Sequence, residues 1–307
     1  MSSPASQTDN SSISRQNLSR GVVAGIASAL AYAMAVVLVR YAYNTGMSAL
    51  TMVSLRFAFA FVSLFAYLKL SGRWVRLPGA QVRTLFLCGL LLYAAMGALW
   101  FAALGMTPSW LVSLLVALFP IPVMLGSWLF LSEKIDRSQI LALFTVLLGS
   151  VALFWRPFSG AALNGVLLMT LSVTLYATYV IVGERWTQGC DALMRTVWTA
   201  LGAMVGSTFY ALLFRQMSLD FAPVGWLWAA LLGIICTILG IAFLWQSVAY
   251  IGPSRAAIVA VLEPLFAVLL SVAVLGDRMS ALQWLGGAII LAGILLIQAQ
   301  PGSNGSS

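Results

Sequence analysis

The stretch "AIVAVLEPLFAVLLSVAVL", residues 257–275, decides the fold class. It is long enough to cross a bilayer, because a helix rising ~1.5 Å per residue needs ~20 mostly apolar residues to span ~30 Å of hydrocarbon. Glu263 and Pro264 interrupt the run near its middle. A carboxylate is costly in hydrocarbon and proline removes a backbone hydrogen bond. The stretch therefore predicts a membrane span that carries a special site.

The composition places the rest of the chain in the same environment. Of the 307 residues, 62% are hydrophobic and only 8% are charged, with a mean hydropathy of +0.99. A soluble domain carries roughly 25% charged residues, so this chain cannot cover a water-facing surface. The net charge is +8, and the basic residues lie between the apolar runs. This position is better explained by a role in orienting the protein in the membrane than by binding to nucleic acid.

Several function classes are excluded by missing residues. The chain has no histidine, which removes histidine triads and histidine metal sites. Its three cysteines show no CxxC spacing, so neither a disulfide framework nor a zinc site is expected. No nucleotide-binding motif is present, so transport driven by ATP on this chain is not expected. We expect no metal, no cofactor and no catalytic residue.

Ten apolar stretches are long enough to be spans. They are residues 21–40, 47–69, 84–104, 109–131, 138–155, 164–183, 192–214, 226–250, 254–275 and 282–299. The predicted fold is an all-α polytopic membrane protein. Residues 1–20 are predicted to form a disordered cytoplasmic tail, and residues 300–307 a C-terminal tail.

An internal repeat organises these spans. "GVVAGIASALAYAMAV" from Gly21 matches "GVLLMTLSVTLYATYV" from Gly165 at six of sixteen positions, with an offset of 144 residues. The same offset relates Pro120 to Pro264. It divides the chain into two five-helix repeats, 21–155 and 164–299. Because five is odd, the second repeat must enter from the opposite side, and inverted repeats of this kind are typical of transporters.

The basic residues predict the orientation. The side that holds both termini carries eleven of them: Arg15, Arg20, Lys69, Arg73, Arg76, Arg83, Lys134, Arg137, Arg185, Arg195 and Arg255. The opposite side carries four: Arg40, Arg156, Arg215 and Arg278. Since basic residues concentrate in cytoplasmic loops, both termini are predicted to be cytoplasmic.

Three segments carry a family resemblance. "SLRFAFAFVSL" at 54–64, "LFPIPVMLGSWLFLSEKI" at 118–135 and "LEPLFAVLLSVAVLGDRM" at 262–279 resemble the EamA-type drug/metabolite transporters. Within them the chain looks most like the bacterial aromatic amino-acid exporters. The resemblance implies a multi-pass exporter of the bacterial inner membrane with a central cavity. Family members often carry Glu-Pro in both halves, whereas Phe119 precedes Pro120 here, which argues against a symmetric two-carboxylate site.

Arg56 and Glu263 are the candidates for substrate binding or coupling. Each lies ~14 Å into its predicted span, about half the depth of the hydrocarbon core. Charged residues at that depth usually face a cavity or a partner. One interpretation is a structural Arg–Glu pair, and the other is a substrate or proton site.

Aromatic residues form a second candidate set. Tyr32 and Tyr176 occupy matched positions of the repeat, as do Trp100 and Trp245. Together with Tyr93, Tyr179 and Gln246 they are predicted to line the cavity, although ordinary helix packing would explain any one of them. Seven other tryptophans lie at span ends and are predicted to form an interfacial belt: Trp74, Trp110, Trp155, Trp186, Trp226, Trp228 and Trp284.

Pro120 and Pro264 are the hinge candidates, because a proline kink repeated in both halves is typical of transporter gates. The other interpretation is a static packing kink. The predicted function is a secondary transporter that exports amino acids of broad type by alternating access. A drug or other small-metabolite transporter of the same fold is the alternative. The expected partners are an amino-acid substrate and the lipid bilayer, without nucleic acid, and the protein is expected to act as a monomer.

Overall fold

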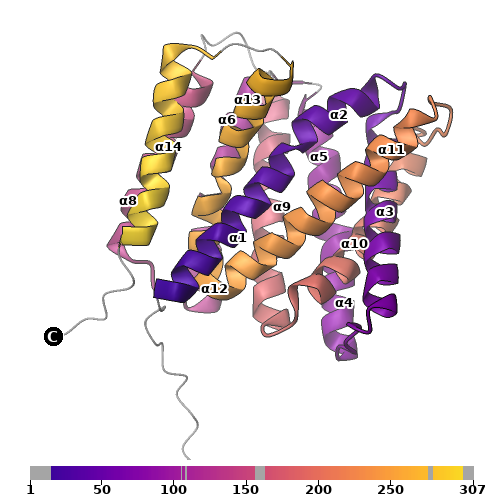
Figure 1. The fold of residues 1–307 in the computed structure, drawn as a ribbon, viewed down its shortest axis with the longest axis horizontal. Helices are drawn as coiled ribbons and strands as arrows, with labels where there is room; N and C mark the ends of the chain where they lie inside the picture. The colour runs from indigo at the N-terminus through magenta and orange to yellow at the C-terminus, as the bar shows by residue number, and fades with distance from the viewer. Residues whose placement is uncertain (1–14, 105, 108, 156–162, 276–278, 300–307) are drawn as a thin grey trace, which may run out of the picture.

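The computed structural model describes residues 15–104, 106–107, 109–155, 163–275 and 279–299, and all regular secondary structure in these ranges is helical (Figure 1). This is the form that long apolar segments must take in a bilayer. Hydrocarbon offers no hydrogen-bond partners, so each segment has to satisfy its own backbone groups.

The helices follow one another closely along the chain. Their bounds are Arg15–Ala33 (α1), Ala35–Tyr43 (α2), Ala49–Leu70 (α3), Gly79–Leu87 (α4), Cys88–Tyr93 (η1), Ala94–Leu104 (α5), Ser109–Ala117 (α6), Pro120–Leu131 (α7), Arg137–Phe154 (α8), Leu163–Thr187 (α9), Ala192–Leu213 (α10), Val224–Leu231 (α11), Leu232–Leu239 (η2), Gly240–Ala260 (α12), Leu262–Leu275 (α13) and Ala281–Ala299 (α14). The segments η1 and η2 are π-helices that continue the α-helices on either side.

Within the described ranges, eight helical segments are long and apolar enough to cross a membrane. They are Arg15–Tyr43, Ala49–Leu70, Gly79–Trp100, Leu111–Leu131, Arg137–Phe154, Leu163–Thr187, Ala192–Leu213 and Val224–Ala260. The last two predicted spans correspond to shorter apolar helices, Leu262–Val274 and Ala281–Ile297. The prediction of ten full-length spans is thus matched in eight cases.

The boundary between the predicted eighth and ninth spans explains why the ninth is short. No separate helix begins at residue 254, because α12 continues through a kink at Gly252 (φ 78°, ψ 162°) as far as Ala260. A positive φ of this size is unfavourable for other residues, and Pro253 directly follows it. A second break, at Val261, separates α12 from α13. At the other end of the chain, α1 begins at Arg15, so residues 15–20 are helical rather than part of a disordered tail. Residues 1–14 and 300–307 lie outside the described ranges.

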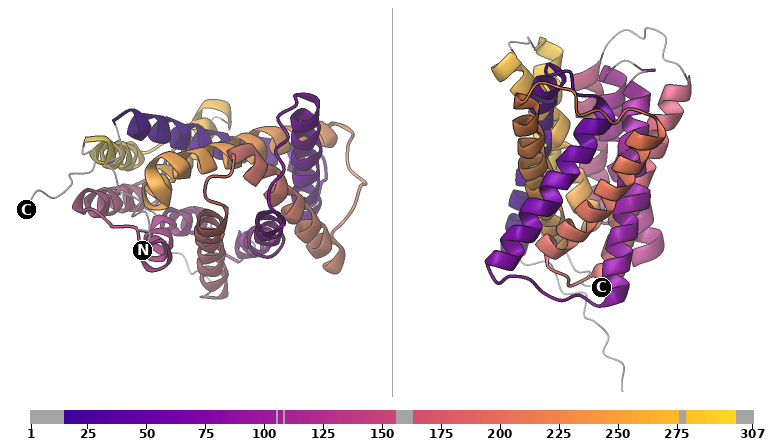
Figure 2. Two further views of the ribbon diagram at one scale, coloured as in Figure 1. Left: turned by 90° about the horizontal axis from the view of Figure 1, so that it is seen from below. Right: turned by 90° about the vertical axis from the view of Figure 1, so that its right-hand side faces the viewer.

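The packing pairs helices from the two halves. Each of three close pairs joins a helix of the first half to a helix of the second half. The pairs are α1 with α12, α3 with α10, and α8 with α14. The α8–α14 pair stands at one edge of the bundle and α3 with α11 at the opposite edge (Figures 1 and 2). The hydrophobic core therefore consists largely of surfaces contributed by both repeats.

The 144-residue offset of the sequence recurs in this packing. The two π-helices begin 144 residues apart, at Cys88 and Leu232. Gly89 and Gly233 are matched in the same way: a Cβ atom would lie 2.2 Å from the carbonyl oxygen of Thr199 at the first, and 2.6 Å from that of Arg56 at the second. Only glycine allows backbones to approach so closely at these two crossings.

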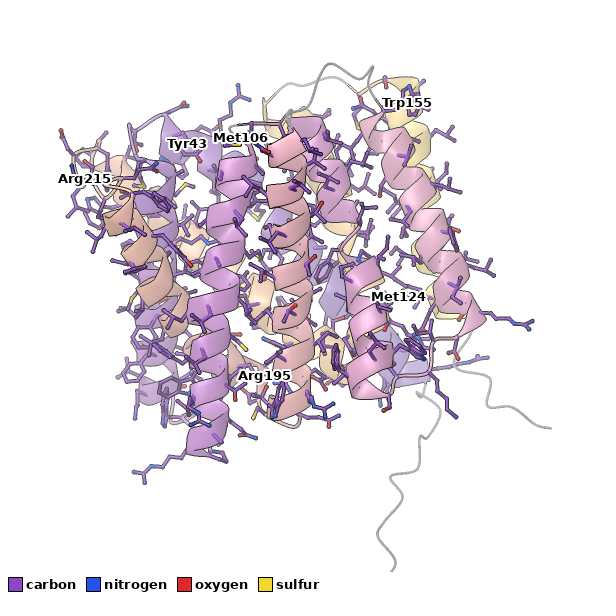
Figure 3. The ribbon with its side chains drawn as sticks, turned by 180° about the vertical axis from the view of Figure 1, so that it is seen from behind. Tyr43, Met106, Met124, Trp155, Arg195 and Arg215 are labelled. Atoms are coloured by element: carbon purple, nitrogen blue, oxygen red, sulfur yellow. The ribbon has the colours of Figure 1, made fainter. Side chains whose placement is uncertain are left out.

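The direction of the chain can be followed in Figure 3. Tyr43, Trp155 and Arg215 lie towards one end of the bundle and Arg195 towards the other. The segment α1–α2 therefore runs towards the Tyr43 end, whereas its repeat partner α9 runs towards the Arg195 end.

Candidate functional site

A connected cluster of aromatic rings lies where the two halves meet. Tyr93 of η1 packs edge-on against Tyr176 and Tyr179 of α9, with ring centroids 5.9 and 5.1 Å apart. Its hydroxyl lies 3.2 Å from that of Tyr32 on α1. The indole Nε1 of Trp245, on α12, donates a hydrogen bond of 2.9 Å to the Tyr179 hydroxyl. Five of the predicted site residues are thereby brought together.

Matched hydrogen bonds hold the helices that carry these rings. The Ser28 hydroxyl of α1 donates to the carbonyl of Gly240, and the Ser172 hydroxyl of α9 donates to the carbonyl of Met96, both at 2.8 Å. Donors and acceptors are each related by the 144-residue offset. The serines lie one helical turn before Tyr32 and Tyr176, so these bonds fix how the two tyrosines face the interior.

Arg56 and Glu263 lie beside this cluster. The ring of Phe57, next to Arg56 in the chain, packs edge-on against Tyr93 with centroids 5.7 Å apart, and Arg56, Glu263 and Tyr93 lie within electrostatic range of one another. The Arg56 guanidinium lies 4.8 Å from the ring of Phe57 on its own helix. Both charged residues are half-buried.

Arg56 and Glu263 do not form a salt bridge. Within the described ranges the ion pairs are Arg195–Glu184 and Arg255–Asp136. The Arg56 Nε is buried and has no hydrogen-bond partner among the described residues. Opposite charges in an apolar bundle normally pair directly or meet a polar partner. Here the two charges lie in the same region of the bundle without a direct bond between them.

The remaining predicted residues are placed differently. Trp100 is half-buried on α5 and packs against the edge of the core. Gln246 is exposed, although its neighbour Trp245 is buried.

Helix breaks accompany both hinge candidates. Pro120 is the first residue of α7, after a break at Leu118 and Phe119. Pro264 lies in the first turn of α13, after the break at Val261. Proline is well tolerated in a first turn because its missing N–H has no helical partner there. The two breaks are matched across the repeat.

A buried ion pair that the sequence did not indicate closes one end of the aromatic cluster. Arg195 is 2% exposed and donates to Glu184 at 2.9 Å and to the carbonyl of Thr187 at 2.5 Å. Its guanidinium lies 4.5 Å from the centroid of Trp245. Arg195 lies near the start of the predicted span 192–214 and was counted among the basic residues on the side of the termini, and no local pattern signals its burial.

A second contact joins the halves at the loop that follows α7. The Glu133 carboxylate accepts a hydrogen bond of 2.8 Å from the Ser254 hydroxyl, and Arg255 pairs with Asp136 at 2.9 Å. Burial raises the pKa of Glu133, while the bonds from Ser254 and the charge of Arg255 act in the opposite direction. This loop therefore docks onto α12 just after the kink at Gly252.

Two surface hollows lie away from the aromatic cluster. One of about 840 Å³ is lined by residues around Glu133, Lys134 and Trp128, and one of about 540 Å³ lies between α7 and α9. Neither includes a predicted site residue. No group of three or more histidine, cysteine, aspartate or glutamate residues suited to a metal occurs in the part of the chain that the structure describes.

Comparison with known proteins assigns the fold to a family. Residues 19–155 and again residues 163–299 match the EamA-like transporter family. An uncharacterized transporter of Archaeoglobus fulgidus is 28% identical over 255 residues, covering 82% of this chain and 88% of that protein. Solute carrier family 35 member B1 of Gallus gallus is 26% identical over 187 residues, and the match covers 57% of this chain and 58% of that protein. A solved crystal structure superimposes with a TM-score of 0.76 at 17% identity, over 90% of this chain and 96% of the other, and supports the fold alone.

The family match covers both halves of the repeat and agrees with the apolar helices of the fold. This chain is a multi-pass membrane protein that belongs to the EamA-like transporter family.

Proposed function

We propose that this protein is a secondary transporter that exports amino acids across the bacterial inner membrane by alternating access. The observation that carries the proposal is the arrangement of Arg56 and Glu263. They are opposite charges beside the same tyrosine cluster, close enough to interact yet without a salt bridge. A zwitterion would satisfy both, with its carboxylate on Arg56 and its ammonium group on Glu263.

The aromatic cluster supports a preference for apolar or aromatic side chains. Tyr93, Tyr176 and Tyr179 present ring faces and edges beside the charged pair, and Phe119 stacks on Tyr176 at 4.5 Å. Rings of this kind enclose apolar groups but offer few polar contacts that would reject a wrong side chain. The proposal therefore includes broad preference and keeps the resemblance to aromatic amino-acid exporters as its narrower form.

The architecture proposed for transport is ten membrane segments in two inverted repeats. It is supported by the matched contacts at the 144-residue offset and by the opposite directions of α1 and α9. In such repeats the substrate site lies near the midplane between the halves. The excess of basic residues on the side of the termini supports cytoplasmic ends.

The alternative is a transporter for drugs or other small metabolites. It is favoured by the same ring cluster, which would accept an aromatic solute that carries no amino or carboxyl group.

Binding to the purified protein distinguishes the two. Phenylalanine should bind more tightly than phenethylamine, which lacks the carboxylate, and phenylpropionate, which lacks the ammonium group. Arg56→Gln should weaken the binding of phenylalanine and of phenylpropionate by about tenfold or more, since a hydrogen bond to a charged group contributes ~1.5–3 kcal/mol. It should leave the binding of phenethylamine unaffected. Glu263→Gln should weaken the binding of phenylalanine and of phenethylamine, the two compounds that carry an ammonium group.

The control is Arg40→Gln, which removes an exposed charge at the end of α2. Equal binding of all three compounds, unchanged in both variants, would favour the drug or metabolite alternative.

A further inference from the structure

A groove runs along the outside of the bundle between α7 and α9. It encloses about 540 Å³, which is within the range of small-molecule sites. Gly126 and Ala177 are among its smallest lining residues, and Leu125, Leu129 and Val182 are among its apolar ones. Figure 3 shows α9 on the face towards the viewer, beside the helix that carries Met124.

The polar residues in the groove do not offer their hydroxyls to a ligand. Thr174 and Thr178 donate to the carbonyls of Thr170 and Thr174, four residues earlier in α9, at 2.8 Å each. Their hydrogen-bonding capacity is used within the helix, and their methyl groups remain. The groove is therefore apolar along most of its length, and in a bilayer its natural occupant is hydrocarbon.

The length of the groove corresponds to one leaflet. Its lining on α9 extends from Thr174 to Trp186. At ~1.5 Å per residue this is ~18 Å, slightly more than half of a ~30 Å hydrocarbon core. A single acyl chain of one leaflet thus matches the groove better than a molecule that crosses the bilayer.

A positive charge stands at one end. Arg185 is exposed and donates from Nη1 to the carbonyl of Phe130, near the end of α7. A guanidinium carries five N–H donors, so this bond leaves others available. Trp186, which is 55% exposed, lies beside it and is a residue type that favours the headgroup region. The charge is held where the phosphate of a lipid in that leaflet would lie.

We propose that the α7–α9 groove binds one anionic phospholipid, with an acyl chain between the helices and the phosphate on Arg185. The site is separate from the Arg56 and Glu263 region and does not depend on which solute is transported. Because α7 begins at the hinge candidate Pro120, an occupied groove would tie the position of α7 to α9 through a lipid.

Photo-crosslinking tests this in nanodiscs that contain the full chain. The probe is phosphatidylglycerol with a photoreactive group on one acyl chain, and phosphatidylcholine with the same group is the zwitterionic comparison. Peptide mass spectrometry should find the label on α7 and α9, with phosphatidylglycerol favoured.

Two variants and a matched control give the test its outcomes. Thr178→Phe fills the groove and should abolish labelling of α7 and α9 by both lipids. Arg185→Gln should reduce the preference for phosphatidylglycerol by about fivefold, the factor expected for one basic residue at an anionic lipid. The matched control is Thr170→Phe, at an exposed position one turn outside the groove. Both lipids should label this variant as they label the unsubstituted protein.

Labelling of Thr178→Phe at the unsubstituted level would overturn the site, as would equal labelling by the two lipids before any substitution. A dimer in native mass spectrometry that Thr178→Phe dissociates would identify a second copy of the chain as the occupant and also overturn the proposal. Gel-filtration elution as a single species shows whether each variant is folded.

Discussion

Arg195 and Arg56 illustrate two environments for a buried cation. Arg195 donates to Glu184 and to a backbone carbonyl, and it lies over the ring of Trp245. Arg56 has a ring on one side and an unpartnered Nε, with Glu263 nearby but not bonded. A buried cation needs compensation. The Nε atoms of both arginines lack a hydrogen-bond partner among the described residues, but only Arg195 has a bonded carboxylate, which is why the proposed substrate site is assigned to Arg56.

Glu133 gives a pH dependence that can be predicted in sign. Its pKa is raised by burial in the docked loop. The docked state thus favours the protonated form, so its contribution to stability is fully present below the ordinary carboxyl pKa and is lost as the pH rises through the raised pKa. Arg255, Lys134 and Asp136 are the charged groups around it.

Glu133→Gln keeps an acceptor for Ser254 and removes the charge. We therefore expect the thermal unfolding midpoint of the variant to exceed that of the unsubstituted protein increasingly as the pH rises from about 5 to about 8. A difference between the two midpoints that stays constant with pH would show that the carboxylate is not desolvated by docking.

At the scale of elements, the helix breaks separate what could be predicted from what could not. The break before Pro264 was predictable, because proline lacks an N–H and the residue recurs at Pro120. The kink at Gly252 was not, since the Gly-Pro pair was expected in a loop between two spans and α12 instead continues past it. The π-helices were also missed, because one extra residue in a turn leaves the hydropathy of a segment unchanged.

Substitution of Pro264 tests its role as a hinge. Pro264→Ala supplies an N–H that can bond the carbonyl of Ala260 only if the helix closes across the break at Val261, and it should therefore join α12 to α13 more rigidly. We expect exchange of substrate in proteoliposomes to slow severalfold, while the unfolding midpoint is kept or rises. Pro223→Ala, at the N-cap of α11, is the control. Unchanged exchange in Pro264→Ala would make the proline a packing residue.

At the scale of the whole molecule, the internal offset was the most informative feature of the sequence. It placed Tyr32 and Tyr176, and the two prolines, at matched positions of the repeat. The structure adds hydrogen bonds and glycine crossings that are related by the same offset. It could not predict that Trp245 would lie between Tyr179 and Arg195, because these contacts join helices far apart along the chain. Gln246, one residue further on, shows how a one-residue step on a helix changes burial.

The proposed topology has a direct test in intact cells. In a background with Cys190→Ser, the buried Cys88 and Cys236 remain. Added singly, Thr45→Cys should react with an impermeant maleimide from outside, and Ser303→Cys should react only after permeabilisation. The reverse pattern, or labelling of both from outside, would contradict cytoplasmic termini.

The central claim is that Arg56 and Glu263 receive an amino acid for transport, and its most direct measurement is uptake into liposomes that contain only this protein. Labelled phenylalanine should enter saturably, faster when unlabelled phenylalanine is enclosed, and the double variant Arg56→Gln with Glu263→Gln should lose this uptake while Arg40→Gln retains it. Absence of saturable uptake for every member of an amino-acid panel, or uptake unaffected in the double variant, would contradict the account.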